Sequence, residues 1–173
     1  RWTMDESTTP DPVEAQASIV FYLFTYTIST AGAFGTLILC GSRGAESVSY
    51  EDLAGLGRRN PAVALVFSLF LLSLAGVPPT AGFFGKFYLF RTAIESGNVG
   101  LAVFGLVNSV VAAYYYLRVL VFMYMREPVP GAPIAVPMKS GYVVAAILFA
   151  AFLVVAVGLV PGHTLDAAIS SAH

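Results

Sequence analysis

The sequence predicts an all-α membrane protein of about four transmembrane helices, and three observations support this. Hydrophobic residues make up 57% of the 173 residues and charged residues only 11%, about half the charge that a soluble domain needs to cover its surface. The apolar residues also occur in runs that reach the roughly 20 residues needed to cross a bilayer. The net charge is −1, which gives no sign of a nucleic-acid partner.

Four apolar stretches are expected to span the lipid bilayer, so that residues 15–161 form a four-helix transmembrane segment. The stretches cover about residues 15–41, 62–91, 99–125 and 141–160. Residues 1–14 form a polar segment without the features of a signal peptide, and residues 162–173 form a C-terminal tail. Because the chain begins with Arg1, we expect a fragment or a processed chain.

Lysines and arginines are concentrated in two loops, which sets the expected orientation. Arg43, Arg58 and Arg59 follow the first stretch, whereas Arg126 and Lys139 follow the third. Short loops rich in basic residues face the cytoplasm. We therefore expect both termini of the chain on the non-cytoplasmic side.

The first of these loops has two interpretations. Ser49 is followed three residues later by Asp52, which resembles a capping box, and Gly57 is a plausible C-cap. These signals predict a short helix at the membrane surface, but an irregular loop fits the same residues equally well.

Polar residues inside the apolar stretches also have a packing interpretation. The first stretch carries Thr25, Tyr26, Thr27, Ser29, Thr30, Gly32, Gly35 and Thr36. Small and hydroxylated residues usually allow neighbouring membrane helices to approach closely. The alternative, that the hydroxyls line a hydrated path, is not favoured by sequence alone.

Asn108 in the third stretch needs a partner in lipid, and we expect it to form a hydrogen bond with another helix. The fourth stretch is almost purely apolar, so it is expected to be lipid-facing or peripheral.

The second stretch is expected to be broken near its middle. Pro78 and Pro79 remove two backbone donors and force Val77 out of helical geometry. Three glycines add backbone freedom around this point: Gly76, Gly82 and Gly85. Carbonyls freed at this depth must be buried in protein or face water, and broken membrane helices recur where ions pass.

Lys86 follows the break and is the main candidate functional residue. An ammonium group inside the membrane costs several kcal/mol unless it is paired or hydrated. A desolvated lysine also gives up its proton more readily, which suits proton exchange. The alternative is that Lys86 snorkels to the membrane surface, because it lies only about 7.5 Å from Arg91 along a helix.

The residues around the break resemble a known family. Residues 73–87, SLAGVPPTAGFFGKF, closely resemble the broken helix of the antiporter-like subunits of respiratory complex I, which are related to Mrp-type cation/proton antiporters. The runs DLAGLGRRNP at 52–61 and YYYLRV at 114–119 are similar to subunit N of the proton-translocating NADH:quinone oxidoreductase. A lysine at position 86 is also what that subunit has. The resemblance covers nearly the whole chain and looks like the C-terminal part of the subunit.

The resemblance implies a role in redox-driven proton translocation in a bacterial inner membrane. In this family a chain of buried lysines, with one glutamate, crosses the subunit near the middle of the membrane. Lys86 matches the last lysine of that chain and is expected to be the terminal proton-relay residue. The earlier members lie on helices that this chain lacks, so it is not expected to pump protons alone.

The expected partners are the other membrane subunits of complex I and the lipid bilayer. No cofactor or metal is expected in this chain, and the flavin, iron–sulfur clusters and quinone are expected in other subunits. The single cysteine, Cys40, cannot hold a cluster.

Two other functions fit the same sequence. One is a subunit of an Mrp-type cation/proton antiporter, against which the YYYLR run argues and which the gene neighbourhood would distinguish. The other is a purely structural or assembly membrane module in which Lys86 snorkels. The direction of the Lys86 side chain bears on the second alternative.

Overall fold

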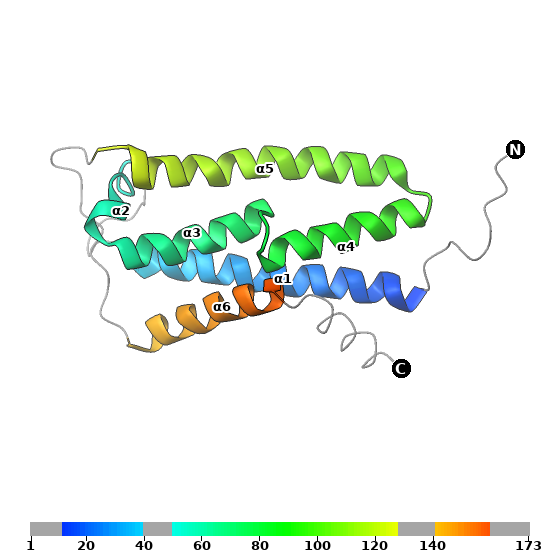
Figure 1. The fold of residues 1–173 in the computed structure, drawn as a ribbon, viewed down its shortest axis with the longest axis horizontal. Coiled ribbons are helices and arrows are strands. Elements are labelled where there is room, and N and C mark those ends of the chain that lie inside the picture. The colour runs from blue at the N-terminus through cyan, green and yellow to red at the C-terminus, as the bar shows by residue number, and fades with distance from the viewer. Residues whose placement is uncertain (1–11, 40–49, 128–140, 160–173) are drawn as a thin grey trace, which may run out of the picture.

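The computed structural model describes residues 12–39, 50–127 and 141–159, and these residues form an all-helical bundle (Figure 1). The elements are α1 (Pro12–Leu39), α2 (Leu56–Arg59), α3 (Pro61–Ala75), α4 (Ala81–Glu95), α5 (Val99–Met125) and α6 (Gly141–Leu159). The long helices run side by side, and α3 and α4 lie end to end as one interrupted helix. The predicted all-α class and the helix broken at Pro78-Pro79 are therefore confirmed.

Helix length and composition agree with a membrane-spanning bundle. Three helices in the described part of the chain are long and apolar enough to cross a bilayer, at Ala15–Leu39, Val99–Met125 and Gly141–Leu159, and Pro61–Ala75 is a shorter apolar helix. Helices α3 and α4 have 15 residues each. Each is thus about 22 Å long, too short to cross about 30 Å of hydrocarbon alone. Lying end to end, the two helices together are long enough for one further span.

Helix α1 lies at the centre of the bundle, in contact with α3, α4 and α6. The hydroxylated residues Thr25, Ser29 and Thr36 are buried. The ring of the fully buried Phe70 on α3 occupies the space that a Cβ atom on Gly32 would need. The small and hydroxylated residues of α1 therefore do permit close helix packing, as the sequence predicts.

Helices α5 and α6 flank the bundle on opposite sides (Figure 1). Helix α6 is apolar, but it is not wholly lipid-facing, because Ile147, Ala151 and Val154 on one face are buried. It ends beside the break between α3 and α4. Asn108 lies on the exposed face of α5, and within the described residues it makes no hydrogen bond to another helix, so the predicted bond does not form among these helices.

The loop before α3 differs from the predicted surface helix. Residues 50–55 form turns, and α2 covers only Leu56–Arg59. Gly57 lies inside α2, so its prediction as a C-cap is wrong, and the left-handed glycine is Gly55, with φ 69°. Arg59 orders the loop by donating hydrogen bonds to the carbonyls of Asp52 (3.2 Å) and Ala54 (2.7 Å). Arg59 makes these contacts with residues seven and five positions before it, which the capping pattern does not predict.

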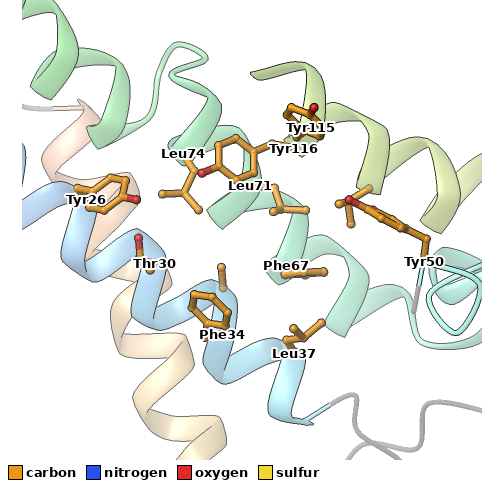
Figure 2. A pocket seen from close by; sticks show the side chains of 12 residues that line it. Tyr26, Thr30, Phe34, Leu37, Tyr50, Phe67, Leu71, Leu74, Tyr115 and Tyr116 are labelled. Atoms are coloured by element: carbon orange, nitrogen blue, oxygen red, sulfur yellow. The ribbon is translucent and has the colours of Figure 1, made fainter. Parts of the chain in front are cut away.

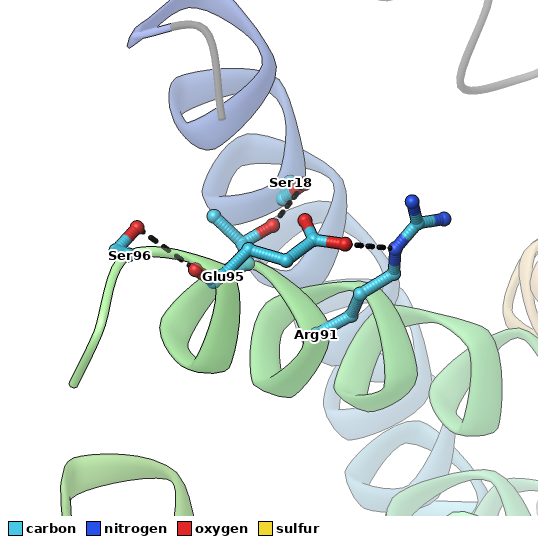
Figure 3. A network of polar contacts seen from close by, with 5 residues as sticks. Ser18, Arg91, Glu95 and Ser96 are labelled. Atoms are coloured by element: carbon cyan, nitrogen blue, oxygen red, sulfur yellow. Dashed lines mark hydrogen bonds and ion pairs between the residues drawn. The ribbon is translucent and has the colours of Figure 1, made fainter. Parts of the chain in front are cut away.

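Polar contacts join α4 to α1 at the end of α4 away from the break (Figure 3). The Thr92 hydroxyl donates to Ser18 Oγ on α1 at 3.2 Å, and within α4 Arg91 Nε pairs with Glu95 Oε1 at 2.7 Å.

Several predictions lie outside the described residues, namely those on residues 1–11, Cys40, Arg43, Ser49, Lys139 and the tail 162–173.

Candidate functional site

The break between α3 and α4 spans residues 76–80. Gly76 ends α3 in the left-handed conformation, with φ 85°, and its N–H donates to the carbonyls of Leu72 and Ser73, both at 3.0 Å. Glycine adopts this conformation without the steric penalty of a Cβ atom. The Pro78-Pro79 peptide bond that follows is cis. The predicted break residues Gly76, Pro78 and Pro79 thus lie within the interruption.

An N–H in the first turn of α4 donates its hydrogen bond to a residue of α3 rather than to the local N-cap. The local N-cap, Thr80, donates its hydroxyl to the Val77 carbonyl (2.7 Å) and makes no side-chain cap bond to α4. Instead, Ser73 Oγ on α3 accepts the N–H of Gly82 at 3.2 Å. One of the orphan donors of the first helical turn is therefore satisfied across the break.

Gly82 and Gly85 lie in α4, and the structure gives them a different role from the one predicted. A Cβ atom on Gly82 would collide with the backbone carbonyl of Ser73, and one on Gly85 would lie 2.7 Å from Thr25 Oγ1. Neither Gly82 nor Gly85 has a positive φ. Their missing side chains therefore allow α4 to approach α3 and α1, rather than adding backbone freedom.

The ammonium group of Lys86 lies at the break itself. Its Nζ donates to the carbonyl oxygens of Leu74 (2.8 Å) and Ala75 (3.2 Å), the last two residues of α3. In a continuous helix these carbonyls would accept the N–H groups of residues 78 and 79, but both are prolines and have none. The Lys86 ammonium thus takes the place of the two missing donors.

The direction of the Lys86 side chain bears on the snorkelling alternative. The side chain is half-buried and points back along α4 toward α3, as helical side chains do. The carbonyl end of a helix carries partial negative charge, which favours a cation there. The ammonium therefore points away from the Arg91 end of α4, whereas snorkelling toward that end would require the opposite direction.

Within the described residues, Lys86 forms no ion pair with a carboxylate. The ion pair described on α4 joins Arg91 and Glu95. Nor do the described residues bring together three or more histidine, cysteine, aspartate or glutamate residues that could hold a metal. Within the described residues the Lys86 ammonium is therefore held by the two backbone carbonyls of Leu74 and Ala75.

The Lys86 side chain lines a small cavity of about 10 Å³. Its polar lining consists of Tyr22, Thr25, Tyr26, Ser29 and Ser73. Ser29 Oγ and Ser73 Oγ are hydrogen-bonded at 2.8 Å, with either oxygen able to donate. The cavity is close to the minimum of about 10–15 Å³ for one water molecule. An amine among hydroxyl groups that can reverse their hydrogen bonds is suited to proton exchange.

A larger cavity of about 450 Å³ lies between α1, α3 and α5 (Figure 2). Its lining residues include Tyr26, Thr30, Leu71, Leu74, Tyr115 and Tyr116. Tyr26 and Leu74 also line the Lys86 cavity, so these two side chains separate the spaces. No sequence motif marks this cavity, although its lining residues Tyr26 and Thr30 lie four positions apart and so share one helix face.

The comparisons with known proteins agree with this architecture. The family model described as "NADH:quinone oxidoreductase/Mrp antiporter, TM" matches residues 10–112. The chain belongs to this family. It is 65% identical over 156 residues to NADH-quinone oxidoreductase subunit N 1 of Sorangium cellulosum, covering 90% of the chain and 31% of that relative. It is 45% identical to the subunit N 1 of Solibacter usitatus, covering 90% of the chain and 32% of the relative.

The fold of this member of the NADH:quinone oxidoreductase/Mrp antiporter family also matches a solved structure. A chain of respiratory complex I from Thermus thermophilus with bound aureothin is 37% identical, with a TM-score of 0.74. The match covers 87% of this chain and 34% of that one. The resemblance to subunit N is therefore confirmed, and the chain spans about a third of the length of the relatives it matches.

Proposed function

We propose that this chain is part of an antiporter-like subunit of a proton-translocating NADH:quinone oxidoreductase. In this proposal Lys86 is the terminal residue of a proton relay. The observation that carries the proposal is the placement of the Lys86 Nζ 2.8 and 3.2 Å from the carbonyls of Leu74 and Ala75. The two prolines create those acceptors, so the break and the lysine form one unit.

The chemistry of this unit suits a reversible proton carrier. Two carbonyl oxygens at a helix C-terminus stabilise the charged ammonium. Because no described carboxylate fixes that charge, a change in charge elsewhere in the protein can tip the balance between ammonium and amine. The proton then leaves Nζ for a neighbouring hydroxyl or water and is later replaced.

The redox chemistry that would drive this cycle is assigned to other subunits. We expect flavin, iron–sulfur clusters and quinone there, and other membrane subunits of the complex as partners. The proposed location is the bacterial inner membrane. The α2 end of the bundle, with Arg58, Arg59 and Arg126, would face the cytoplasm according to the positive-inside rule, and both termini would lie on the other side.

The proposal is tested by replacing Lys86 with alanine in the full-length subunit of the intact complex. NADH-driven proton uptake and NADH oxidation are measured in inverted membrane vesicles, and assembly is checked on native gels. We expect proton uptake per NADH oxidised to fall in assembled Lys86→Ala complexes. Arg91→Ala is the matched control, since this second cation of α4 is exposed and paired with Glu95. Unchanged proton uptake with normal assembly in Lys86→Ala would favour a purely structural role.

A further inference from the structure

Two arginines at the α2 end of α5 share one aromatic ring. Arg118 lies near the end of α5, and Arg126 directly follows the helix. The Cζ atom of Arg118 lies 6.0 Å from the centre of the Phe122 ring, and that of Arg126 lies 5.4 Å from it. Arg118 also lies over the ring of Tyr50, with its Cζ 5.5 Å from the ring centre. Cation–π contacts of this kind hold a guanidinium in place but leave its positive charge intact.

The charges of Arg118 and Arg126 are not neutralised by the carboxylates near them. Both side chains are exposed. Three acidic residues lie at the same end of the bundle: Glu51, Asp52 and Glu127. Within the described part of the chain no salt bridge joins any of them to either guanidinium, and the salt bridge described there lies on α4. Two like charges on one ring repel each other, so an anion beside both guanidiniums would be bound favourably.

Helix length places this pair at a membrane surface. Helix α5 has 27 residues and is therefore about 40 Å long, whereas the hydrocarbon core is about 30 Å thick. The end that carries Arg126 thus extends into the headgroup region. Arg118 starts about 12 Å farther back along the helix axis, but its side chain reaches Tyr50 in the turns before α2. Long basic side chains extend to the interface in this way, so both guanidiniums are within reach of lipid phosphates.

The surface of α5 next to Arg118 is exposed and mostly apolar. Exposed side chains extend from this point toward the middle of the membrane, among them Val107, Val110, Val111, Tyr114, Leu117 and Val121. A free phosphate ion would match the arginines but not this surface, and a purely apolar helix would match the surface but not the arginines. An anionic phospholipid matches both, since it joins a charged headgroup to acyl chains.

We propose that Arg118 and Arg126 bind the headgroup of an anionic phospholipid whose acyl chains lie along the exposed surface of α5. A planar guanidinium can donate two parallel hydrogen bonds to phosphate oxygens. Basic residues beside a transmembrane helix recognise anionic headgroups through the same attraction. The bound lipid neutralises both arginines. Its binding does not depend on proton transfer by Lys86, so the inference goes beyond the proposed function.

The proposal is tested with two photo-reactive lipid probes in the intact complex, reconstituted in phosphatidylcholine nanodiscs. One probe is a phosphatidylglycerol and the other a phosphatidylcholine, with the same acyl chains and a diazirine near the glycerol, so that they differ in headgroup alone. Labelled peptides within residues 114–126 are mapped by mass spectrometry. We expect the phosphatidylglycerol probe to label this segment more strongly by about fivefold or more, since one basic residue at a membrane surface contributes roughly fivefold to the binding of anionic lipid.

Arginine variants locate the binding site. Arg118→Gln and Arg126→Gln should each lower labelling by the phosphatidylglycerol probe by about fivefold. Arg58→Gln is the matched control, because Arg58 is also exposed at the α2 end but is not one of the two cations that lie over the Phe122 ring. Assembly of each variant is checked on native gels. An equal loss of labelling in Arg58→Gln would overturn the site, because the total basic charge would then explain the binding.

Two further results would overturn the proposal. Equal labelling by both probes would show that lipid lies on α5 without recognition of its charge. Absence of labelling by either probe would show that protein covers this surface in the assembled complex. The proton uptake of the Lys86→Ala variant changes neither expectation, because labelling is measured without NADH. A failure of the proposed function is therefore distinguishable from a failure of the lipid site.

Discussion

The Nζ of Lys86 lies 2.8 Å from the carbonyl oxygen of Leu74, a carbonyl that would otherwise bond the backbone N–H of residue 78. Proline at that position has no N–H to donate. The same relation links Ala75 with Pro79, and the Lys86 ammonium bonds both carbonyls. A feature that weakens the helix is thus also the feature that creates a cation site in the bundle interior.

Gly76 is expected to leave the space that the Lys86 side chain needs to reach the helix break. An alanine there would adopt φ 85°, which costs about 1–2 kcal/mol for an L-residue. Its Cβ would also lie 3.2 Å from Lys86 Cδ and 3.4 Å from Nζ. Gly76→Ala should therefore lower both the thermal stability of the complex and its proton uptake.

Gly97→Ala is the control for this prediction. Gly97 also has a positive φ, 77°, but it follows the far end of α4, away from Lys86. The strain should be similar, so the loss of stability should be similar, while proton uptake per assembled complex stays near wild type. An equal loss of uptake in both variants would show that strain alone explains the effect of Gly76→Ala.

The helices and the break could be predicted from sequence because both depend on local chemistry. The length of the apolar runs reflects bilayer thickness, and adjacent prolines in the interior of a helix interrupt it. The environment of Lys86 was only partly predictable. Its acceptors, Leu74 and Ala75, precede the two prolines by four residues, which marks them as carbonyls without donors. Whether Lys86 turns toward them or toward the surface depends on packing.

The rest of the site depends on contacts between distant segments. The Ser29–Ser73 bond joins residues 44 positions apart, and the large cavity needs Tyr116 from α5 to face Tyr26 from α1. No local pattern encodes such pairings. In the loop before α3, Arg59 and the left-handed Gly55 order the turns, whereas the sequence fitted a surface helix and an irregular loop equally well.

Ser73 is expected to be more important for stability than Ser29, its hydrogen-bonding partner. Ser73→Ala removes the acceptor of the buried Gly82 N–H, and an unsatisfied buried donor costs about 1–3 kcal/mol. Ser29→Ala leaves that bond in place and removes one hydroxyl contact, worth about 0.5–1.5 kcal/mol. The melting temperature of the complex, or of its membrane domain, should fall further for Ser73→Ala. The opposite order would contradict the capping role of Ser73.

Gly158 is expected to seal the break from the α6 side. A Cβ atom at this position would collide with the Pro79 carbonyl oxygen and lie 2.8 Å from Ala81 N and from Thr80 C. Backbone atoms cannot move aside as a flexible side chain can, and overpacking costs about 1–3 kcal/mol. We expect Gly158→Ala to displace α6 and to reduce the amount of assembled subunit on native gels.

Gly100→Ala provides the matched control for that prediction. Gly100 lies in α5, and a Cβ atom there meets nothing within 4 Å. In a helix alanine is favoured over glycine by about 1 kcal/mol, so this variant should assemble at least as well as wild type. Comparable assembly of Gly158→Ala and Gly100→Ala would show that α6 does not pack tightly on the break.

Arg59 is expected to order residues 50–55, the turns that precede α2. Its Nη2 donates to the carbonyls of Asp52 (3.2 Å) and Ala54 (2.7 Å), and hydrogen bonds from a charged group contribute about 1.5–3 kcal/mol. Arg59→Ala should speed hydrogen exchange of the backbone amides of residues 54–56, measured by mass spectrometry. Arg58→Ala is the control, because the neighbouring Arg58 side chain is exposed and should leave the exchange unchanged. Equal exchange rates in the two variants would indicate that backbone contacts, such as the Gly55 N–H to Phe122 carbonyl bond at 3.4 Å, hold the loop without the guanidinium.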